Sequence, residues 1–486
     1  MGQSGFGRRQ FLGLTAAAGA AVAGARLLGE PLAAAASGVD YAGLKRALKG
    51  PLLRPGDAGY TAAAKPYNAA LGVRRPAAIA KVAGADDVRT CVRRVRGHGV
   101  PLAARGGGHS YAGYSTPDNG VVVDLSALKT ITVKSDATAV IGAGARLIDV
   151  YAALAAHGRA LPAGSCPTVG IAGSTLGGGI GVVARAYGLT CDHLKAATVV
   201  TADGALHTVD GYNDADLFWA LRGGGGGNGG IVTSFTFGTV PAPTVTVFSL
   251  HFPASRTARV LRCWSAWMDA APNQLSSLCA VTAASTPTNR VTGTWTGSSA
   301  ALAGHLSSLI AAVGAAPTSR TTHAYSYLNA MKYFAGCLDN TITACHAGGP
   351  APFRAASRML ERTVTSSAAD RVVSLMSRQN GTVLLFDSLR GQVAGIKTAD
   401  TAFAHRSAHA SVQVYSGNAA NGPAVLAVQQ ALTSTVGTGA YVNYLNPGQR
   451  DWASAYYGAN LPRLRRVIKK YDPDRVFDFA QSVLRA

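Results

Sequence analysis

The stretch Arg105-Gly106-Gly107-Gly108-His109-Ser110 sets three consecutive glycines directly after a short β-prone run, 101–104. Two more glycine-dense stretches follow strand-like runs, at 164–181 and at 222–230. Glycine lets the backbone approach a bound anion closely and turn its N–H groups toward it. A single loop of this kind is as often a tight turn as a binding loop. Three of them in one part of the chain favour a site for an anionic dinucleotide.

The third stretch contains Gly225-x-Gly227-x-x-Gly230, which has the spacing of a dinucleotide-binding fingerprint. A run of glycines matches that spacing by chance, and no βαβ unit with a downstream acidic residue adjoins it. This stretch therefore gives no support to a nicotinamide-binding Rossmann site.

Strand-like and helical runs alternate around these loops, between residues 76 and 241. Alternation rich in branched residues predicts strands, and apolar spacing of three to four residues predicts helices. We expect strands at 77–82, 101–104, 120–125, 139–142 and 197–201, and helices at 86–98 and 147–157. The preceding segment, 41–73, is punctuated by proline and glycine and is expected to form an N-terminal arm. The pattern is typical of an α+β or α/β domain.

The character of the chain changes after Pro241-Ala242-Pro243, and we expect a second, mixed domain over 244–435. Its patterns predict sheet at 244–252 and 280–295 and helices at 254–269 and 304–313. The last fifty residues predict one helix from Trp452 to Tyr471, ended by Asp472-Pro473.

The first 36 residues are typical of an export signal. Arg8-Arg9 precede an uncharged stretch, and the small-residue run 33–36 suits signal peptidase. The paired arginines indicate the twin-arginine route, which exports proteins already folded. The alternative is a basic helix that stays attached, but the apolar stretch is too short to span a bilayer. We expect a secreted, extracellular protein that takes up any cofactor before export.

The cysteines show no metal-binding pattern. There are seven, and they form neither a CxxC pair nor a zinc spacing, so no metal site is predicted. Cys337 with Cys345 and Cys263 with Cys279 are possible disulfides, although connectivity cannot be read from a sequence.

The chain of 486 residues carries 45 Lys and Arg against 24 Asp and Glu, a formal charge of +21. Such a charge is compatible with binding to nucleic acid, an acidic membrane surface or an anionic polymer. The basic residues are scattered, and their densest cluster, at 463–470, has no nucleic-acid-binding signature. No apolar run long enough to cross a bilayer follows the first forty residues. We expect no nucleic-acid partner and no stable membrane insertion.

Two of the glycine loops and the C-terminal segment together resemble a known family. The motifs are Arg105 to Ser110 with Tyr111-Ala112-Gly113-Tyr114, Leu161-Pro162-Ala163-Gly164-Ser165-Cys166-Pro167-Thr168-Val169-Gly170, Gly177-Gly178-Gly179-Ile180-Gly181, Tyr441-Val442-Asn443-Tyr444, Tyr456-Tyr457-Gly458-x-Asn460-Leu461 and Tyr471-Asp472-Pro473-Asp474-Arg475-Val476-Phe477. They resemble the berberine bridge enzyme-like oxidases, flavoproteins of the vanillyl-alcohol-oxidase superfamily. The resemblance covers about 70–486 and is least distinct in the second domain.

The resemblance implies an α+β fold of three parts. A PCMH-type FAD-binding domain of two α/β subdomains, with the N-terminal arm, would occupy 37–243. A substrate-binding domain built on an antiparallel sheet would occupy 244–435. The C-terminal segment, 436–486, would return to the FAD-binding domain.

The resemblance also implies covalent FAD. In bicovalent members, the histidine of the first loop bonds the flavin 8α-methyl group and the cysteine of the second bonds ring carbon 6, positions that fall on His109 and Cys166. In the family this attachment raises the reduction potential of the flavin. Without the resemblance, the two residues would be interpreted as a turn histidine and a small buried thiol. The other residues placed at FAD are Arg105, Gly106, Gly107, Gly108, Ser110, Gly164, Thr168, Val169, Gly170, Gly173, Ser174, Gly178, Gly179, Gly181, Ile231, Val232, Asn443 and Asn460.

Oxygen and substrate sites follow from the same resemblance. Val169 falls where oxygen reaches the flavin, and valine there accompanies oxidases. Tyr441 falls on the catalytic base, with a strand aromatic in the core as the alternative, and Gln413 falls on a glutamine that lines the substrate site. A phenol has a pKa of about 10 and needs a nearby cation or hydrogen-bond donors to act at neutral pH. The acidic base that plant alkaloid enzymes carry before the His405-Arg406 pair is absent from 401–404, which favours alcohol oxidation and a structural role for that pair.

We therefore expect a monomeric FAD oxidase that takes a hydride from a hydroxyl-bearing carbon of a carbohydrate, an oligosaccharide or a secondary metabolite, with molecular oxygen reduced to hydrogen peroxide. Export favours a carbohydrate. Trp264, Trp267, Tyr325 and Tyr327 either stack on sugar faces or belong to the core. One alternative is a flavin dehydrogenase that passes electrons to a quinone or a protein, and another is a basic surface-binding protein without turnover.

Overall fold

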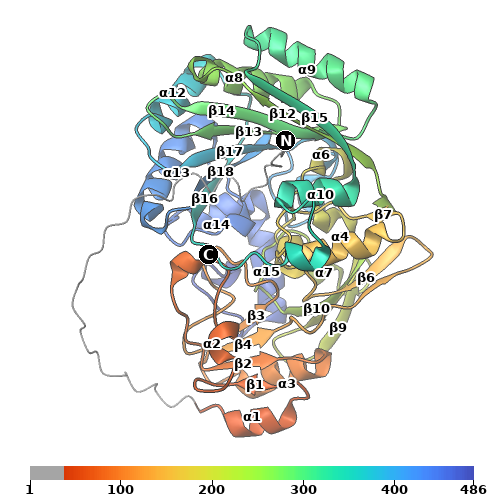
Figure 1. The fold of residues 1–486 in the computed structure, drawn as a ribbon. Helices are drawn as coiled ribbons and strands as arrows, with labels where there is room; N and C mark the ends of the chain where they lie inside the picture. Colours follow the sequence, from red (N-terminus) through yellow and green to blue (C-terminus); the bar gives the residue numbers. More distant parts are fainter. Residues whose placement is uncertain (1–37) are drawn as a thin grey trace.

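The computed structural model describes residues 38–486, so the predicted export signal lies outside the described residues. The chain forms a lower part, with three sheets built from 52–241, and an upper part, with one seven-stranded sheet built from 244–416 (Figure 1). Among the described helices, none combines the length and the apolar character that a bilayer crossing requires.

A four-stranded sheet with the order β1-β2-β4-β3 lies at the base of the lower part. Strand β4 is parallel to both β2 and β3, whereas β1 is antiparallel to β2. Its inner strands are continuous runs of apolar residues, as expected for strands covered on both faces. The elements are β1 (Leu52–Leu53), β2 (Ala78–Lys81), β3 (Leu102–Arg105), β4 (Val121–Asp124), α1 (Tyr41–Ala47), α2 (Tyr60–Ala63) and α3 (Ala85–Val95).

The predicted N-terminal arm is part of this sheet rather than an appendage. It supplies α1, α2 and the edge strand β1. The buried carboxylate of Asp87 accepts hydrogen bonds from the N–H groups of Lys49, Gly50 and Ala83, which ties the arm to α3. Helix α3 ends at Val95, three residues earlier than predicted.

The second sheet of the lower part is antiparallel, with the order β5-β6-β10-β8-β9. Its helices pack beside it and position the glycine loops. The elements are β5 (Ile131–Val133), β6 (Thr138–Gly142), β8 (Leu194–Val200), β9 (Leu206–Asp210), β10 (Ile231–Gly238), α4 (Leu147–Ala155), α5 (Ile171–Leu176), α6 (Ala184–Tyr187) and α7 (Ala215–Leu221); β7 (Arg159–Ala160) and β11 (Val240–Pro241) form a separate pair.

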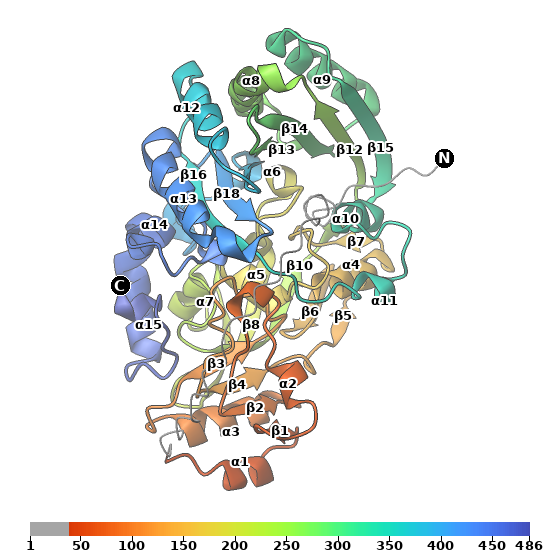
Figure 2. The same cartoon turned by 60° about the vertical axis from the view of Figure 1, so that its left-hand side comes forward.

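The upper part is a fully antiparallel sheet with the order β15-β12-β14-β13-β17-β18-β16. Four helices cover one face and bury its apolar residues in a core of their own (Figures 1 and 2). The elements are β12 (Thr244–His251), β13 (Leu275–Thr282), β14 (Thr288–Trp295), β15 (Ser319–Ser326), β16 (Arg354–Leu360), β17 (Val383–Ser388), β18 (Ala410–Ser416), α8 (Thr257–Ala270), α9 (Ser299–Val313), α12 (Ser366–Met376) and α13 (Gly422–Val436).

Two segments of the later chain return to the lower part. Helices α10 (Tyr327–Ala335) and α11 (Ile342–Cys345) pack against α4. A disulfide joins Cys337 to Cys345, which confirms one of the two pairings suggested from the sequence. The other suggested pairing is wrong, because Cys263 and Cys279 are free, buried thiols on α8 and β13.

The C-terminal segment is also different from the prediction of a single helix. It forms α14 (Trp452–Tyr457) and α15 (Leu461–Tyr471), separated at Gly458, whose φ of 46° and ψ of −133° interrupt the helix. Proline at 462 then starts the second helix, where its missing N–H is not needed. Both helices lie along one side of the molecule in Figure 2, and α15 packs against α7.

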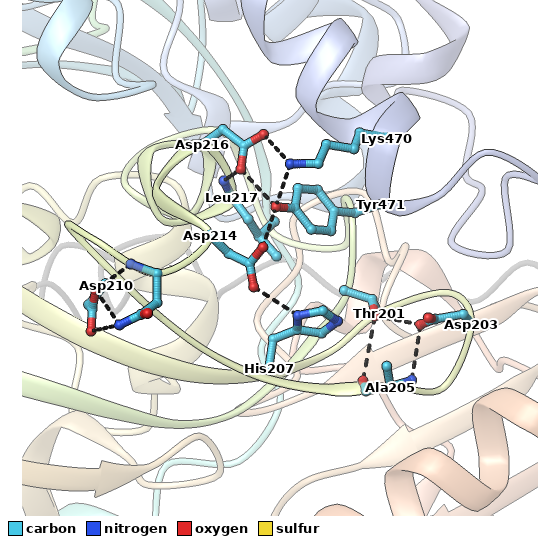
Figure 3. A network of polar contacts seen from close by, with 11 residues as sticks. Thr201, Asp203, Ala205, His207, Asp210, Asp214, Asp216, Leu217, Lys470 and Tyr471 are labelled. Carbon is cyan, nitrogen blue, oxygen red and sulfur yellow. Dashed lines mark hydrogen bonds and ion pairs between the residues drawn. The ribbon is translucent and has the colours of Figure 1, made fainter.

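A network of polar side chains fastens the end of α15 to the lower part (Figure 3). The Tyr471 hydroxyl lies 2.8 Å from Asp214 Oδ1 and 2.7 Å from Asp216 Oδ1. Lys470 pairs with Asp216 at 2.9 Å, and His207 Nδ1 contacts Asp214 at 2.8 Å. The C-terminal segment is therefore anchored by an ion pair and by hydrogen bonds as well as by its apolar face.

Candidate active site

A cavity of about 1190 Å³ lies between the two parts. One wall consists of the three glycine loops of the lower part, and we call it the glycine wall (106–115, 164–174 and 225–232). The opposite wall consists of cavity-facing side chains of β13, β17 and β18, and we call it the sheet wall (Leu278, Val383, Leu385, Gln413 and Tyr415). Residues 441–445 and 474–480 close the remaining side. The cavity thus combines all three predicted parts of the chain.

The first two glycine loops pack backbone against backbone. A Cβ at Gly107 would lie 2.3 Å from Gly170 N and 2.9 Å from Thr168 O, and a Cβ at Gly170 would lie 2.3 Å from Gly107 N. Since no side chain fits at either position, glycine is required at both. This contact holds the segment that carries His109 beside the segment that carries Cys166.

His109 and Cys166 meet around one hydroxyl group. His109 Nε2 lies 3.0 Å from Thr168 Oγ1, and Cys166 Sγ lies 3.9 Å from the same atom. The ring of Tyr67 stacks on the imidazole with 3.7 Å between the ring centroids. Both predicted linking residues are half-buried and line the cavity.

The cavity fits a large bound cofactor in two respects. The Tyr114 hydroxyl, which lines it, is buried and has no hydrogen-bond partner among the described residues, which indicates that a ligand group satisfies it. Burial raises the pKa of Tyr114, so this group is a neutral donor. In addition, a Cβ at Gly173 would meet no atom within 4 Å, so the space in front of α5 is open.

Tyr441 is buried at the side of the cavity, and its hydroxyl receives three N–H groups. Gly179 N lies 3.0 Å away, Ile180 N 3.1 Å and Asn443 Nδ2 2.9 Å. Burial raises the pKa of Tyr441 above its usual value, and the three N–H groups act in the opposite direction. A phenol that acts as a base at neutral pH needs hydrogen-bond donors or a cation nearby, and the structure supplies donors.

Gln413 belongs to an aromatic lining around Tyr441. Its Nε2 donates to the Tyr111 hydroxyl at 2.9 Å. Tyr111 stacks on Tyr444 at 5.1 Å, and Tyr444 meets Tyr441 edge-on at 4.9 Å. Both residues predicted to face the substrate, Gln413 and Tyr441, therefore line the same cavity.

Most of the residues that the resemblance places at FAD line the cavity. Besides His109 and Cys166 they are Gly106, Gly107, Gly108, Ser110, Gly164, Val169, Gly170, Gly173, Ser174, Ile231, Val232 and Asn443. Thr168 does not line it but contacts both linking residues, and Gly179 does not line it but donates to Tyr441.

Four of the predicted positions, Arg105, Gly178, Gly181 and Asn460, are absent from the lining of this cavity. The Arg105 guanidinium donates to the carbonyl oxygens of Ala63 and Lys65 in the N-terminal arm. The amide of Asn460 is buried and donates to the carbonyl oxygens of Thr398, Thr401 and Ala402. Backbone or side-chain packing occupies Gly178 and Gly181. Through these hydrogen bonds, Arg105 and Asn460 support the fold around the site.

Two buried arginines join the lower and upper parts next to the site. Arg406 pairs with Asp192 at 2.7 Å, in agreement with the structural role expected for it. Arg185, which the sequence analysis did not single out, donates to the carbonyl oxygens of Ala271, Leu275 and Leu389 in the upper part. His405 Nε2 donates to the carbonyl oxygen of Tyr456, so this residue is also structural.

Sequence reasoning missed several other residues of the cavity. Tyr67 lies in the segment interpreted as an arm, where nothing distinguished it from an ordinary loop tyrosine. Tyr111 and Tyr444 stood inside the family motifs, but no role was assigned to them. Tyr111 follows His109 closely in the chain, and Tyr444 follows Tyr441. This proximity is the signal from which their place in the site could have been predicted.

The fold and the cavity define a flavin-dependent oxidoreductase, and comparisons with known proteins agree. Residues 76–210 match the family described as FAD binding domain, and residues 440–484 match the family described as berberine and berberine like. The chain belongs to the berberine bridge enzyme-like FAD-linked oxidoreductases.

Relatives of similar length support this assignment. The chain is 34% identical to the uncharacterized FAD-linked oxidoreductase YgaK of Bacillus subtilis, over 90% of this chain and 98% of the relative. It is 30% identical to a chitooligosaccharide oxidase of Gibberella zeae, over 84% and 87% of the two chains.

Solved structures show the same fold. The berberine bridge enzyme-like 1 protein of Physcomitrella patens superimposes with a TM-score of 0.84, at 27% identity over 91% of this chain and 98% of that one. A glucooligosaccharide oxidase of Acremonium strictum, which is described with a 6-S-cysteinyl, 8α-N1-histidyl FAD, superimposes with a TM-score of 0.83, at 26% identity over 92% and 99%.

Proposed function

We propose that the chain is a secreted oxidase that carries FAD covalently on both His109 and Cys166 and oxidises a hydroxyl group of a carbohydrate, an oligosaccharide or a secondary metabolite. The pairing of the two side chains around Thr168 supports the double link. The linkage named for the glucooligosaccharide oxidase also supports the double link, and the oligosaccharide substrates in the names of three relatives support oxidation of a carbohydrate hydroxyl group.

The environment of the Tyr441 hydroxyl is the observation that carries the proposal. A neutral phenol oxygen accepts two hydrogen bonds through its two lone pairs, whereas a phenolate accepts three. The N–H groups of Gly179, Ile180 and Asn443 therefore stabilise the ionised form, against burial, which raises the pKa of Tyr441. We propose that ionised Tyr441 takes the proton of the substrate hydroxyl.

Bound FAD supplies the hydride acceptor. The residues of this chain bind, orient and deprotonate the substrate. As Tyr441 takes the hydroxyl proton, the C–H bond of the same carbon breaks with its electron pair and a C=O bond forms. In the net reaction, one molecule of alcohol and one of oxygen give one molecule of carbonyl product and one of hydrogen peroxide. The alcohol is oxidised by two electrons, oxygen is reduced by two, and the two hydrogen atoms lost by the alcohol end in the peroxide.

The double link can be tested by denaturing the protein with trichloroacetic acid. We expect yellow colour to remain with the wild-type precipitate and with each of the single variants His109→Ala and Cys166→Ala, and to be released from the double variant. Mass spectrometry of peptides containing each residue measures the link directly. Loss of all bound flavin from Cys166→Ala would contradict two independent bonds.

Anaerobic reduction of the flavin tests Tyr441. We expect Tyr441→Phe to slow reduction by about 10²–10⁴-fold, the usual contribution of a positioned base, with little change in substrate affinity. Since burial raises the pKa of Tyr441, the wild-type reduction rate should rise with pH across the neutral range, and the variant should lack this rise. Unchanged reduction in Tyr441→Phe would remove Tyr441 as the base.

Oxygen as the acceptor is proposed because Val169 is small and lines the cavity. Comparing reoxidation by oxygen with reoxidation by a quinone analogue separates an oxidase from a dehydrogenase. If only the quinone analogue supports turnover, the chain is a dehydrogenase.

Export by the twin-arginine route and a monomeric state are proposed from the sequence alone. Replacing Arg8-Arg9 by two lysines should retain the protein in the cell, whereas the wild type should be secreted. Size-exclusion chromatography with light scattering should give the mass of one chain. Secretion of the lysine variant at the wild-type level would contradict the route.

A further inference from the structure

The side chains on the face of the sheet that bounds the cavity change from apolar to polar from one part of the sheet to the next. Val383 and Leu385 point toward the cavity, whereas Leu384, between them, is buried in the core of the upper part, as strand alternation requires. With Leu278, Ala280 and Tyr415 they form an apolar patch, which is separate from the core under the helices. Leu278, Val383, Leu385 and Tyr415 line the cavity that contains Tyr441.

A second cavity, of about 820 Å³, continues along the same face of the sheet. We call it the polar groove and define it by Ser249, Thr292, Thr294, Thr321, His323 and Tyr325. It shares Ser165, Leu278, Arg290 and Phe334 with the first cavity, so the two are continuous. Tyr325 and Tyr333 both line the groove, and their rings stack with 5.5 Å between the centroids.

Strand register shows how abrupt the change is. Leu385 pairs with Ala280, and Ala280 pairs with Arg290. In the next row, Leu278 pairs with Thr292, Thr292 with Ser249, and Ser249 with Thr321. The face is therefore apolar at Val383 and Leu385 of β17 and at Leu278 and Ala280 of β13, and cationic at Arg290 of β14. It becomes polar from the next row on, with the Asp387 carboxylate opposite Leu278 and hydroxyl groups on β14, β12 and β15.

The four aromatic residues considered as sugar platforms divide accordingly. Trp264 and Tyr327 are buried, and Trp267 is half-buried against the core with its Nε1 on His305 O. Of the four, Tyr325 alone lines the polar groove, and its partner is Tyr333. Of these four residues, Tyr325 is therefore the one that can offer a ring face to a ligand in the polar groove.

We infer that the substrate is amphiphilic: an apolar ring system that carries the hydroxyl to be oxidised, with a hydrophilic, glycosyl-like extension. The ring system lies on the apolar patch next to Tyr441, and the extension crosses Arg290 into the polar groove. This inference rests on the proposed function and decides between its substrate classes in favour of a glycosylated secondary metabolite over a free oligosaccharide. Apolar surface in a binding cavity is matched by apolar ligand surface, and a few polar groups fix the orientation.

Three alcohols test the inference: 4-(hydroxymethyl)phenyl β-cellobioside, cellobiose, and 4-methoxybenzyl alcohol. The first has both the apolar ring and the glycosyl extension, and each of the others lacks one. We expect kcat/KM for anaerobic flavin reduction to be at least about tenfold higher for the first than for either other compound. The highest value for cellobiose would overturn the inference while leaving the proposed oxidase function intact.

Variants on the two walls give matched controls. Leu385→Gln should lower kcat/KM for the cellobioside by about tenfold, and Leu385→Met, which stays apolar, should restore it. Thr321→Trp should fill the groove and remove the advantage of the cellobioside over 4-methoxybenzyl alcohol. Thr322→Trp, on the opposite face of the same strand, should leave that advantage unchanged. Equal effects of Thr321→Trp and Thr322→Trp would contradict the use of the groove.

Calorimetric titration separates failure of the inference from failure of the proposed function. If none of the three alcohols reduces the flavin, the proposed function is wrong for these substrates, but their binding still measures the two surfaces. Tighter binding of the cellobioside than of both fragments would support the inference. Equal or weaker binding would overturn it.

Discussion

The glycine wall and the sheet wall face each other across one cavity but are built in opposite ways. In the glycine wall, backbone packs against backbone, as at Gly107 and Gly170, and a Cβ cannot be added. In the sheet wall, alternate side chains of β13, β17 and β18 form the surface, and their backbone lies in the sheet. The first wall therefore tolerates no change of residue at these contacts, whereas the second can change its chemistry without disturbing the fold. In the proposed function, the first wall holds the cofactor and the second selects the substrate.

The largest effect should come from filling the backbone contact of the glycine wall. In Gly107→Val, the new Cβ would collide with Gly170 N and Thr168 O, so unfolding should become easier by about 3 kcal/mol, and the protein should lose its flavin. Thermal unfolding and the ratio of flavin absorbance to protein absorbance measure both.

Gly173→Ala is the matched control. Its Cβ meets no atom within 4 Å, and alanine favours helix α5, so the melting temperature of the apoprotein should not fall. Because the methyl group occupies the space in front of α5, flavin incorporation should still decrease. If Gly173→Ala destabilises the apoprotein as much as Gly107→Val, the distinction between packing and cofactor space in this wall is wrong.

Asn443→Leu removes one of the three donors from Tyr441. Flavin reduction should slow by about 10- to 100-fold, and the pH at which the rate rises should move upward, because the Asn443 amide lowers the pKa of Tyr441. Stopped-flow reduction across pH measures the shift.

Asn460→Ala provides the comparison for Asn443. It removes hydrogen bonds to the carbonyl oxygens of Thr398 and Thr401, so it should lower the melting temperature and leave the pH profile in place. A shifted pH profile in Asn460→Ala would place that residue in the active site after all.

Thr168→Val removes the hydroxyl between His109 and Cys166 with little change in shape. We expect covalent incorporation of FAD into the apoprotein to slow severalfold, because neither side chain is then held in place. Thr168→Ser keeps the hydroxyl and should incorporate FAD at the wild-type rate. Equal rates for the valine and serine variants would show that the hydroxyl does not position the linking residues.

A small effect is expected at the network that anchors α15, which lies outside both walls. Hydrogen bonds from Tyr471 and His207 hold the pKa of Asp214 below its usual value, and Lys470 and Tyr471 do the same for Asp216 against the effect of burial. The unfolded chain therefore binds these protons more readily, and the stabilisation is present above about pH 4 and is lost as the pH falls below it. The melting temperature of Tyr471→Phe should differ from wild type well above that pH and converge with it well below. A constant difference would show that the network is not linked to these carboxylates.

The sequence predicted the glycine wall better than the sheet wall for a physical reason. The backbone contact between the loops requires glycine at 107 and 170, and the proposed flavin links require His109 and Cys166. The short sequence motifs therefore contain the residues that set the geometry of this wall. Leu385 and Thr321 look like ordinary strand residues, and only the register of seven strands brings them onto one surface. That register cannot be predicted from any short stretch of the sequence.

Other differences have equally local causes. The helix from Trp452 to Tyr471 is broken because Gly458 leaves the helical conformation, although the apolar spacing continues through it. Asn460 stands in a motif, but its amide turns inward to carbonyl oxygens. Cys263 on α8 and Cys279 on β13 are near in sequence and share one core, but they remain free thiols there. Arg185 was missed because three carbonyl oxygens from distant segments define its role.

The Arg185 guanidinium has a consequence for how molecules reach the flavin. By holding three main-chain oxygens of the upper part, together with the Arg406–Asp192 pair, it opposes any hinge about which the two parts could open and shut. Reactants and products should therefore reach the cavity without a rigid-body opening of the two parts.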